Sequence, residues 1–452
     1  MKTATIIGSG LVGSLWASYL AREGYTVNVF ERRPDLRKTS MSAGKSINLA
    51  TSYRGWKALD AIGVGDAIRT IAIPMYGRTL HDLDEQTHFQ PYGIKGQAIF
   101  SVSRGEINGK LMDLAEQTGK VQIRFNCECI SAEPELAKAT FKDHETGEVF
   151  SHQSDVMFAT DGAFSAVRYQ SFMKLDRFSF SQNYIADGYR EILLPANADG
   201  SYKLEKNSLH IWPRGRFMLI ALPNEDGSFT CTLFMPFEGD KFGFNNLNSA
   251  EKVNEFFSST FPDFYKLMPD IAEAWDRHPL SSLAIIRCYP WFYGKTILMG
   301  DAAHATVPFF GQGMNCGFED CTVLWELMKA HGEDWKKIGE AYQVARKPNG
   351  DAVQDLSLQN YLVMRDKVND PSFQLLQRVE RRMSELYPEK YFPLYSMVSF
   401  TDIEYQVALA KGNEQESHIK QFIRQYAITE ATTQHQLDEW IHASLGQTLI
   451  TH

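Results

Sequence analysis

The sequence predicts a mixed α/β (α+β) fold in three parts, and three observations lead to that expectation. Residues 3–31 contain a short apolar strand, a glycine-rich turn, a helical segment that ends at Gly24, and a second strand. Residues 175–290 alternate apolar and polar positions between turn signals, which is typical of an antiparallel sheet. From about residue 315 onward, apolar residues recur with helical spacing to the end of the chain.

The first part contains the run GSGLVG, in which Gly8, Gly10 and Gly13 follow the GxGxxG pattern. In such a turn the first glycine permits a tight bend, the second admits a pyrophosphate, and the third lets helix and strand pack closely. Glu31 ends the next strand, where an acid accepts hydrogen bonds from a ribose hydroxyl. This order favours a Rossmann-like dinucleotide site over a glycine turn without a ligand. The pattern alone does not choose between FAD and NAD.

Two further turns follow apolar strands. The run ATDGAFSAVR places Asp161 after one strand, and the run ILMGDAAHATVPFFGQGMN places Asp301 after another. Taken alone, the Asp-Gly pair at Asp161 is equally well an ordinary turn. An acid at a strand end suits a ribose or polyol hydroxyl, and the glycines after Asp301 expose main-chain N–H groups where a helix begins. The scarcity of side chains there predicts room for an isoalloxazine ring and its ribityl chain.

Composition and charge exclude several classes of protein. The formal net charge is −9 and no block of lysine or arginine occurs, which argues against a nucleic-acid binder. The six cysteines are scattered without paired metal-ligand spacing, so we expect no metal site and reduced thiols in a cytoplasmic protein. No signal-peptide pattern and no long apolar run is present, and the charged, amphipathic C-terminal segment predicts no membrane anchor.

The three turns, in this order and spacing, resemble those of the single-component FAD-dependent aromatic hydroxylases. Further segments, as far as about residue 400, resemble the kynurenine-hydroxylating branch of that family. These segments are FERRPD, SINLA, GRTLHD, QPYG, LHIWPRG, IALPN, TLFMPF, VPFFGQGMNCGFED, QNYLVMRDKV and YSMVSF. The resemblance implies one bound FAD, NADPH and O2 as co-substrates, and conversion of L-kynurenine to 3-hydroxy-L-kynurenine through a flavin C4a-hydroperoxide.

The same resemblance implies a substrate site with a polar end and an apolar end. The polar end, for the carboxylate and amino group, comprises Arg78, Tyr92, Asn360 and Tyr395. The apolar end, for the aromatic ring, comprises Leu209, Ile220, Phe234, Pro308, Phe309, Phe310 and Met364. Without the resemblance, the arginine would be interpreted as a solvated or ion-paired side chain, and the apolar residues as core.

For FAD, the resemblance implies contacts from the three turns and from two neighbouring segments. These residues are Gly8, Gly10, Val12, Gly13, Glu31, Arg32, Ala50, Arg104, Asp301, Gly311, Gly313, Met314 and Asn315. A helix that begins near Gly313 would direct its positive end at the flavin. No protein residue is expected to be catalytic, because the flavin carries the chemistry. His304 in DAAH is expected to orient the loop rather than to transfer a proton.

The chain is expected to divide into discontinuous domains. The expected domains are an FAD-binding domain (1–75, 98–175 and 285–330), a substrate-binding sheet domain (76–97 and 176–284) and a helical region (331–452) packed over the substrate pocket. Monomer and dimer both remain open. Three alternatives remain: a flavin hydroxylase of another aromatic substrate such as a phenol, benzoate or anthranilate, an oxidoreductase that uses no oxygen, and a nucleotide-binding protein without activity.

Overall fold

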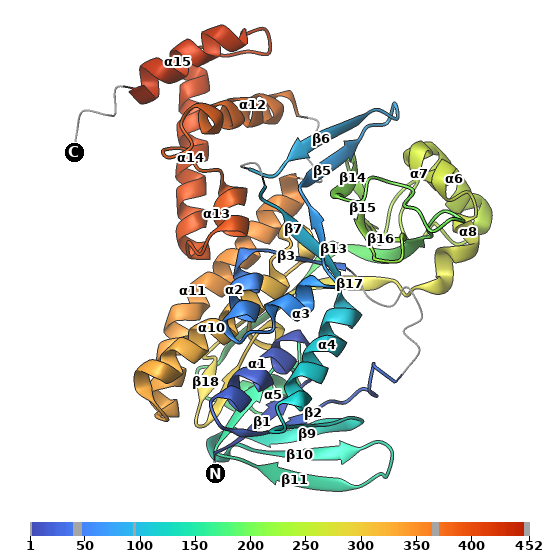
Figure 1. The fold of residues 1–452 in the computed structure, drawn as a ribbon. Helices are drawn as coiled ribbons and strands as arrows, with labels where there is room; N and C mark the ends of the chain where they lie inside the picture. The colour runs from blue at the N-terminus through green and yellow to red at the C-terminus, as the bar shows by residue number, and fades with distance from the viewer. Residues whose placement is uncertain (1, 39–47, 94–95, 364–369, 447–452) are drawn as a thin grey trace.

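The computed structural model describes residues 2–38, 48–93, 96–363 and 370–446 (Figure 1). Within these residues the chain forms four β-sheets and a set of helices that continues to the C-terminal part. The mixed α/β architecture with a helical C-terminal region confirms the expected fold class. None of the helices in the described ranges combines the length and apolar character that crossing a membrane requires.

A six-stranded sheet forms the nucleotide-binding part of the molecule, with strand order β18-β19-β12-β1-β2-β8. Its strands are β1 (Thr3–Ile7), β2 (Thr26–Phe30), β8 (Val121–Arg124), β12 (Val156–Ala159), β18 (Phe292–Tyr293) and β19 (Thr296–Leu298). All neighbouring strands pair in parallel except β18 and β19. Because β1, β12 and β19 are parallel, the three turns that follow them meet at one edge of the sheet.

Helices and a small sheet pack around this six-stranded sheet. The helices α1 (Leu11–Arg22), α4 (Arg104–Gln117) and α10 (Gly313–His331) pack beside one another. The small sheet comprises β9 (Cys127–Glu133), β10 (Lys138–Asp143) and β11 (Val149–Gln153). Phe30 of β2 stacks on Phe141 of β10 with 4.1 Å between ring centroids. The apolar strand residues are buried between these layers, as parallel sheets require.

The alternating apolar and polar positions in the middle of the sequence correspond to a seven-stranded sheet, with strand order β17-β13-β16-β15-β14-β5-β6. Its strands are β5 (Gly77–His81), β6 (Thr87–Pro91), β13 (Ser179–Leu194), β14 (Ser208–Arg214), β15 (Phe217–Pro223), β16 (Phe229–Pro236) and β17 (Ser281–Tyr289). Only the β5–β14 pair is parallel. One face is covered by α6 (Ala250–Thr260), α7 (Pro262–Leu267) and α8 (Ile271–Ala274), which form a core with Trp212 and Phe229.

The remaining elements connect these sheets and form the C-terminal part. A third small sheet contains β3 (Asn48–Thr51), β4 (Ile73–Met75) and β7 (Ile99–Ser103). The other helices are α2 (Tyr53–Ala61), α3 (Gly65–Arg69), α5 (Ala166–Gln170), α9 (Asp301–His304), α11 (Trp335–Leu362), α12 (Pro371–Leu386), α13 (Leu394–Phe400), α14 (Tyr405–Gln425) and α15 (Gln434–Gly446). Short 3₁₀ turns occupy Pro134–Leu136, Phe172–Lys174, Trp275–Arg277 and Pro308–Phe310. Helices α12, α14 and α15 lie at one end of the molecule, and α13 lies next to α2 and contacts the seven-stranded sheet through Tyr395 (Figure 1).

A buried histidine pair lies on the helix-covered face of the seven-stranded sheet. His210 Nε2 lies 2.9 Å from the Glu205 carbonyl oxygen, so this nitrogen donates and Nδ1 accepts. His81 Nε2 then donates to His210 Nδ1 over 2.9 Å, and His81 Nδ1 donates to Asp263 over 2.8 Å. In this pattern His210 Nδ1 is an acceptor, so the His210 side chain is neutral.

This pair predicts a loss of stability in acid. Burial, followed by the charge of His81, lowers the pKa of His210 from 6.5 to about 4. The unfolded chain therefore binds more protons than the folded one between these pH values. The contribution of the neutral His210 to the free energy of unfolding is therefore complete above pH 6.5. It decreases by up to roughly 3 kcal/mol as the pH falls toward 4.

Urea unfolding of the wild type and of His210→Gln, at neutral pH and near pH 4.5, measures this contribution. We expect the variant to be less stable at neutral pH and to lose less stability in acid. His418→Gln, at an exposed position on α14, is the matched control. Equal acid losses in the wild type and in His210→Gln would contradict the assignment.

Candidate active site

One large cavity joins the strand ends of the six-stranded sheet to the open face of the seven-stranded sheet. Its volume is about 2380 Å³, and residues of α10 to α14 also line it. Pockets for single drug-sized ligands measure about 300–1000 Å³. The cavity therefore has room for a dinucleotide together with a second, smaller molecule.

The GxGxxG turn forms one end of the cavity and needs its glycines. Gly8 has a φ of +97°, and a Cβ there would lie 2.7 Å from the Thr160 carbonyl oxygen. A Cβ on Gly13 would lie 2.1 Å from the Gly8 carbonyl oxygen, whereas a Cβ on Gly10 would meet nothing within 4 Å. The first and third glycines thus allow strand and helix to approach, and the second leaves open space on the cavity side.

Glu31 connects this turn to the end of β2. Its carboxylate accepts hydrogen bonds from the Ser9 amide at 2.9 Å and from Arg33 Nε at 2.7 Å. Burial opposes its ionisation, but the hydrogen bond and charge of Arg33 lower the pKa of Glu31 below its ordinary value. The side chain is a buried carboxylate at neutral pH, at the cavity wall next to the exposed Arg32.

The Asp-Gly turn after β12 carries a buried acid with one unused oxygen. Asp161 Oδ2 accepts from the Val167 amide at 3.2 Å, while Oδ1 is shielded from solvent and has no hydrogen-bond partner among the described residues. Burial raises the pKa of Asp161. Such an orphaned acceptor facing a cavity is the kind of group that a ligand hydroxyl satisfies.

The third turn brings bare backbone to the cavity. Gly300 has a φ of +57° and Gly311 a φ of +68°, both favourable only for glycine. The exposed Asp301 begins α9, and Gly313 begins the 19-residue helix α10. The Asn315 side chain donates to the Ala50 and Gly311 carbonyl oxygens at 2.8 and 3.0 Å. Asn315 therefore holds the turn against β3.

A cation and two phenols lie together at the polar end of the second compartment. The Arg78 guanidinium lies 5.5 Å from the ring centroid of Tyr395 and 5.9 Å from that of Tyr92. The two rings stack with 5.2 Å between centroids. Burial, above all, raises the pKa of both tyrosines, so both phenols keep their protons. No carboxylate among the described residues pairs with Arg78.

Apolar and aromatic side chains form the other end of this compartment. The Phe309 ring lies 4.9 Å from that of Phe234 and 4.8 Å from that of Tyr361. Asn360 donates from Nδ2 to the Phe309 carbonyl oxygen at 2.5 Å, which connects α11 to this wall. The ring of Phe310 stacks near Tyr395 at 5.7 Å, so the apolar wall continues to the phenols.

Most residues singled out from the sequence lie around this one cavity. Those that line it are Gly8, Gly10, Val12, Glu31, Arg32, Ala50, Arg78, Tyr92, Arg104, Leu209, Ile220, Phe234, Asp301, Pro308, Phe309, Phe310, Gly311, Gly313, Met314, Asn360 and Tyr395. Gly13 and Asn315 lie behind the wall and hold it in shape. Met364 falls outside the described residues.

Sequence reasoning missed one lining residue that the structure makes prominent. Gln312 is 2% exposed, donates to Ser52 Oγ at 3.4 Å and accepts from the Tyr405 hydroxyl at 3.0 Å. Gln312 lies inside the run PFFGQGMN, in which the glycines indicated a role for main-chain N–H groups and gave no sign of a role for this side chain. Its partners, Ser52 just before α2 and Tyr405 on α14, are too distant in sequence to be inferred from that run.

The family described as FAD binding domain matches residues 1–357. The donors and spaces of the cavity fit FAD: an open glycine turn at a helix N-terminus, an orphaned buried acceptor at Asp161, and a second helix N-terminus at Gly313. Among solved structures, the chain has the fold of 2-methyl-3-hydroxypyridine-5-carboxylic acid oxygenase, with a TM-score of 0.67 and 20% identity over 82% of this chain and 94% of that one. It also resembles the tetracycline destructase Tet(51), with a TM-score of 0.61 and 18% identity over 89% and 99% of the two chains.

Among curated proteins, the kynurenine 3-monooxygenase of Flavobacterium johnsoniae is 48% identical over 422 residues, which are 93% of each chain. That of Myxococcus xanthus is 44% identical over 412 residues, 91% of this chain and 88% of the other. That of Sus scrofa is 41% identical over 419 residues, 92% of this chain and 87% of the other. The chain is thus an FAD-binding flavoprotein that belongs to the kynurenine 3-monooxygenase family of FAD-dependent aromatic hydroxylases.

Proposed function

We propose that this protein hydroxylates L-kynurenine to 3-hydroxy-L-kynurenine, with NADPH as reductant and O2 as oxidant. The single observation that carries the proposal is Arg78, which pairs with no carboxylate of the described residues, beside the protonated phenols of Tyr92 and Tyr395. All three lie in the cavity that also contains the three dinucleotide-binding turns. An amino acid with an aromatic side chain matches a pocket with a cation at one end and aromatic rings at the other. The names of the curated relatives support this choice of substrate.

At the polar end, Arg78 would bind the substrate carboxylate with charge-assisted hydrogen bonds, and the Tyr92 and Tyr395 hydroxyls would donate to it. The raised pKa values of the two tyrosines support this role, because a phenolate would repel a carboxylate. Asn360 would hold the polar end closed against the Phe309 backbone.

At the apolar end, the aromatic ring of the substrate would lie among the side chains that already surround this space. Leu209, Ile220, Phe234, Pro308, Phe309 and Phe310 line it. They would orient the ring and exclude water. Water in such a site would promote oxidation of NADPH without hydroxylation of the substrate. Met364 is proposed for the same wall.

FAD would extend from the GxGxxG turn to the start of α10. The turn at Gly8, Gly10 and Val12 would bind the pyrophosphate, supported from behind by Gly13, with Glu31 and Arg32 at the adenosine end. Ala50 and Arg104 would lie beside the flavin, and Asp301 would bind the ribityl chain. Gly311, Gly313 and Met314 would form the pyrimidine side, supported from behind by Asn315. When bound, FAD supplies the reduction and oxygen-transfer chemistry.

The protein needs no acid–base dyad to activate the ring, because the amino group on the ring of kynurenine already enriches the neighbouring carbon in electrons. Its own task is to fix that carbon and to keep water out. The proposed division of labour follows: residues 1–75, 98–175 and 285–330 hold FAD, residues 76–97 and 176–284 supply the substrate-binding sheet, and residues 331–452 close the cavity.

The decisive experiment supplies the purified holoprotein with L-kynurenine, NADPH and air, and identifies the product by mass spectrometry. We expect kynurenine-dependent NADPH oxidation, matching O2 consumption, and a product heavier by one oxygen atom that comes from labelled O2. Benzoate, phenol and anthranilate serve as comparison substrates. Turnover of one of these without turnover of kynurenine would replace the proposed substrate, and substrate turnover without O2 consumption would overturn the monooxygenase assignment.

A further inference from the structure

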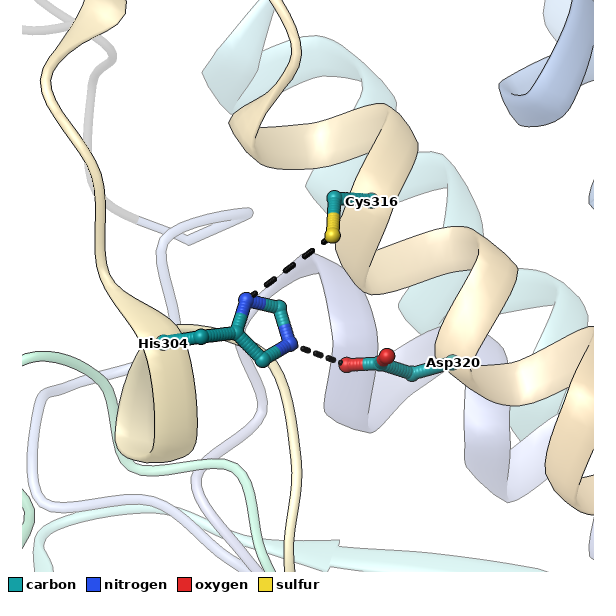
Figure 2. A group of neighbouring side chains, drawn as sticks. All are labelled: His304, Cys316 and Asp320. Carbon is teal, nitrogen blue, oxygen red and sulfur yellow. Dashed lines mark hydrogen bonds and ion pairs between the residues drawn. The ribbon is translucent and has the colours of Figure 1, made fainter. Parts of the chain in front are cut away.

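A fully buried group of three side chains lies directly behind the Gly300–Asp301 turn. Figure 2 shows His304 between Cys316 and Asp320, with the imidazole directed at both. His304 Nε2 lies 2.6 Å from Asp320 Oδ2, and His304 Nδ1 lies 3.9 Å from Cys316 Sγ. His304 is 3% exposed, and the other two are 0% exposed.

The arrangement of these atoms suggests a metal site or a nucleophilic triad, but the surroundings exclude both. The ligand atoms lie within 4.8 Å of one another. However, Arg346 donates from Nε to Asp320 Oδ1 at 2.7 Å and from Nη2 to Cys316 Sγ at 3.3 Å. A guanidinium therefore occupies the place where a cation would be bound. None of the three side chains lines the cavity, so the thiol has no access to a substrate.

The group instead fixes the turn that carries Asp301. Asp320 Oδ2 accepts from the Gly300 amide at 2.9 Å and from His304 Nε2 at 2.6 Å. These two donors stand at the two ends of the short helix α9. A buried guanidinium holds its middle, because Arg168 donates to the Ala302 carbonyl oxygen at 2.6 Å. A single oxygen of Asp320 thus holds both ends of α9 by hydrogen bonds.

Charge makes this attachment strong. Burial alone would lower the pKa of His304, but attraction by Asp320 raises it well above its usual range, so the side chain is an imidazolium. Burial alone would raise the pKa of Asp320, but His304 and Arg346 lower it to about 2. Asp320 is therefore a buried carboxylate between two cations. Loss of its charge leaves His304 without an anionic partner among the described residues and leaves Arg346 with Glu319 alone.

Arg346 extends the group to the C-terminal helices. Its Nη1 donates to Glu319 at 2.5 Å, and Glu319 also accepts from Arg54 Nη1 at 2.5 Å. The Arg54 guanidinium lies 4.1 Å from the ring centroid of Tyr405, at the start of α14. The turn beneath Asp301 is thereby anchored to α2, α10, α11 and α14.

We propose that Asp320 is a positioning residue for FAD: by holding Gly300 and His304 it places the Asp301 carboxylate at the cofactor. This rests on the proposed contact between Asp301 and the ribityl chain. Asp320 itself faces away from the cavity and acts only through α9. Its effect on FAD must therefore depend on Asp301.

A double-mutant cycle tests this dependence. Asp320→Asn, Asp301→Ala and the double variant are stripped of FAD, and the dissociation constant for FAD is measured by fluorescence quenching without kynurenine. We expect Asp320→Asn to weaken FAD binding by at least about tenfold in the wild-type background and by less than about threefold when Asp301 is already alanine. Glu326→Gln, at an exposed position on the same helix, is the matched control and should leave FAD affinity unchanged.

A merely structural role would give a different result. In that case Asp320→Asn would weaken FAD binding by the same factor in both backgrounds, or would lower the unfolding midpoint while FAD affinity stays unchanged; either outcome overturns the proposal. If Asp320→Asn does not fold, His304→Gln replaces it in the same cycle, since it removes the imidazolium but keeps the Gly300 and Arg346 bonds to Asp320. Because kynurenine is absent, failure of the proposed substrate would leave the cycle unaffected.

Discussion

Replacing Arg78 with alanine is expected to weaken kynurenine binding by about 2–3 kcal/mol, or roughly 30- to 150-fold in the dissociation constant. No carboxylate of the described residues pairs with this guanidinium, so the substrate carboxylate would be its ionic partner. Tyr92 and Tyr395 would still donate hydrogen bonds, which is why some binding should remain. The dissociation constant follows from the change in the flavin spectrum on titration with kynurenine, and FAD content should be unchanged.

Two further variants sharpen the measurement. Arg78→Lys keeps the charge but not the two-pronged geometry, so its affinity should lie between those of the wild type and the alanine variant. Arg216→Ala removes an exposed arginine in the β14–β15 turn of the same sheet and should change nothing. If Arg78→Ala bound kynurenine as tightly as the wild type, or lost FAD together with kynurenine, Arg78 would have no place in the substrate site.

The parts of the fold that the sequence predicts best are those in which a local pattern determines the geometry. The glycine turn at Gly8 follows a strand and precedes a helix, and only glycine tolerates the close approach of Thr160. Asp161 and Asp301 are each expected after an apolar strand, and in the structure both lie at one edge of the six-stranded sheet. The parallel order of β1, β12 and β19 brings them there.

The substrate compartment could not be predicted from periodicity or spacing. Arg78 lies on a sheet strand and Tyr395 on a helix near the other end of the chain, and no local signal relates them. Their pairing came from resemblance alone, and the structure places them in contact at the cavity wall. The contact between these two residues depends on how α13 packs against the seven-stranded sheet. That packing cannot be read from a short segment of sequence.

Buried charges were the hardest feature to anticipate. Nothing in the sequence distinguishes Asp320, Arg346 and Arg54 from charged residues on a solvated helix face, yet each is 0–2% exposed. Each is buried because it has partners of opposite charge on other elements. A charged residue is expected at the surface because burying its charge is unfavourable. The oppositely charged partner that compensates for burial cannot be identified from the sequence. His81 and His210, on separate strands, escaped notice for the same reason.

The second large effect is expected from Gly13→Ala. A Cβ at this position would lie 2.1 Å from the Gly8 carbonyl oxygen and 2.5 Å from Thr160 Oγ1. Because the first of these is backbone, α1 must move away from β1, and its N-terminal amides move with it. We expect the free energy of unfolding of the FAD-free protein to fall by about 1–3 kcal/mol. FAD affinity should fall by roughly 100-fold, measured by titration of the apoprotein.

Gly10→Ala separates the two roles of the glycine turn. A Cβ there meets no protein atom within 4 Å, and the backbone φ of −69° suits alanine. Gly10 is the N-cap of α1, where alanine is less favourable than glycine, but alanine also lowers the conformational entropy of the unfolded chain. The two effects oppose each other, so the stability of the FAD-free protein should change by less than about 1 kcal/mol. FAD affinity should nevertheless fall, because the added methyl group occupies the space proposed for the pyrophosphate.

Gly109→Ala in α4 is the control, since a Cβ there makes only ordinary contacts at 3.5 Å; it should lower neither stability nor FAD affinity. Unchanged FAD affinity in Gly10→Ala would mean that the pyrophosphate does not pass over this turn, and the proposed path of the cofactor through the cavity would have to be redrawn.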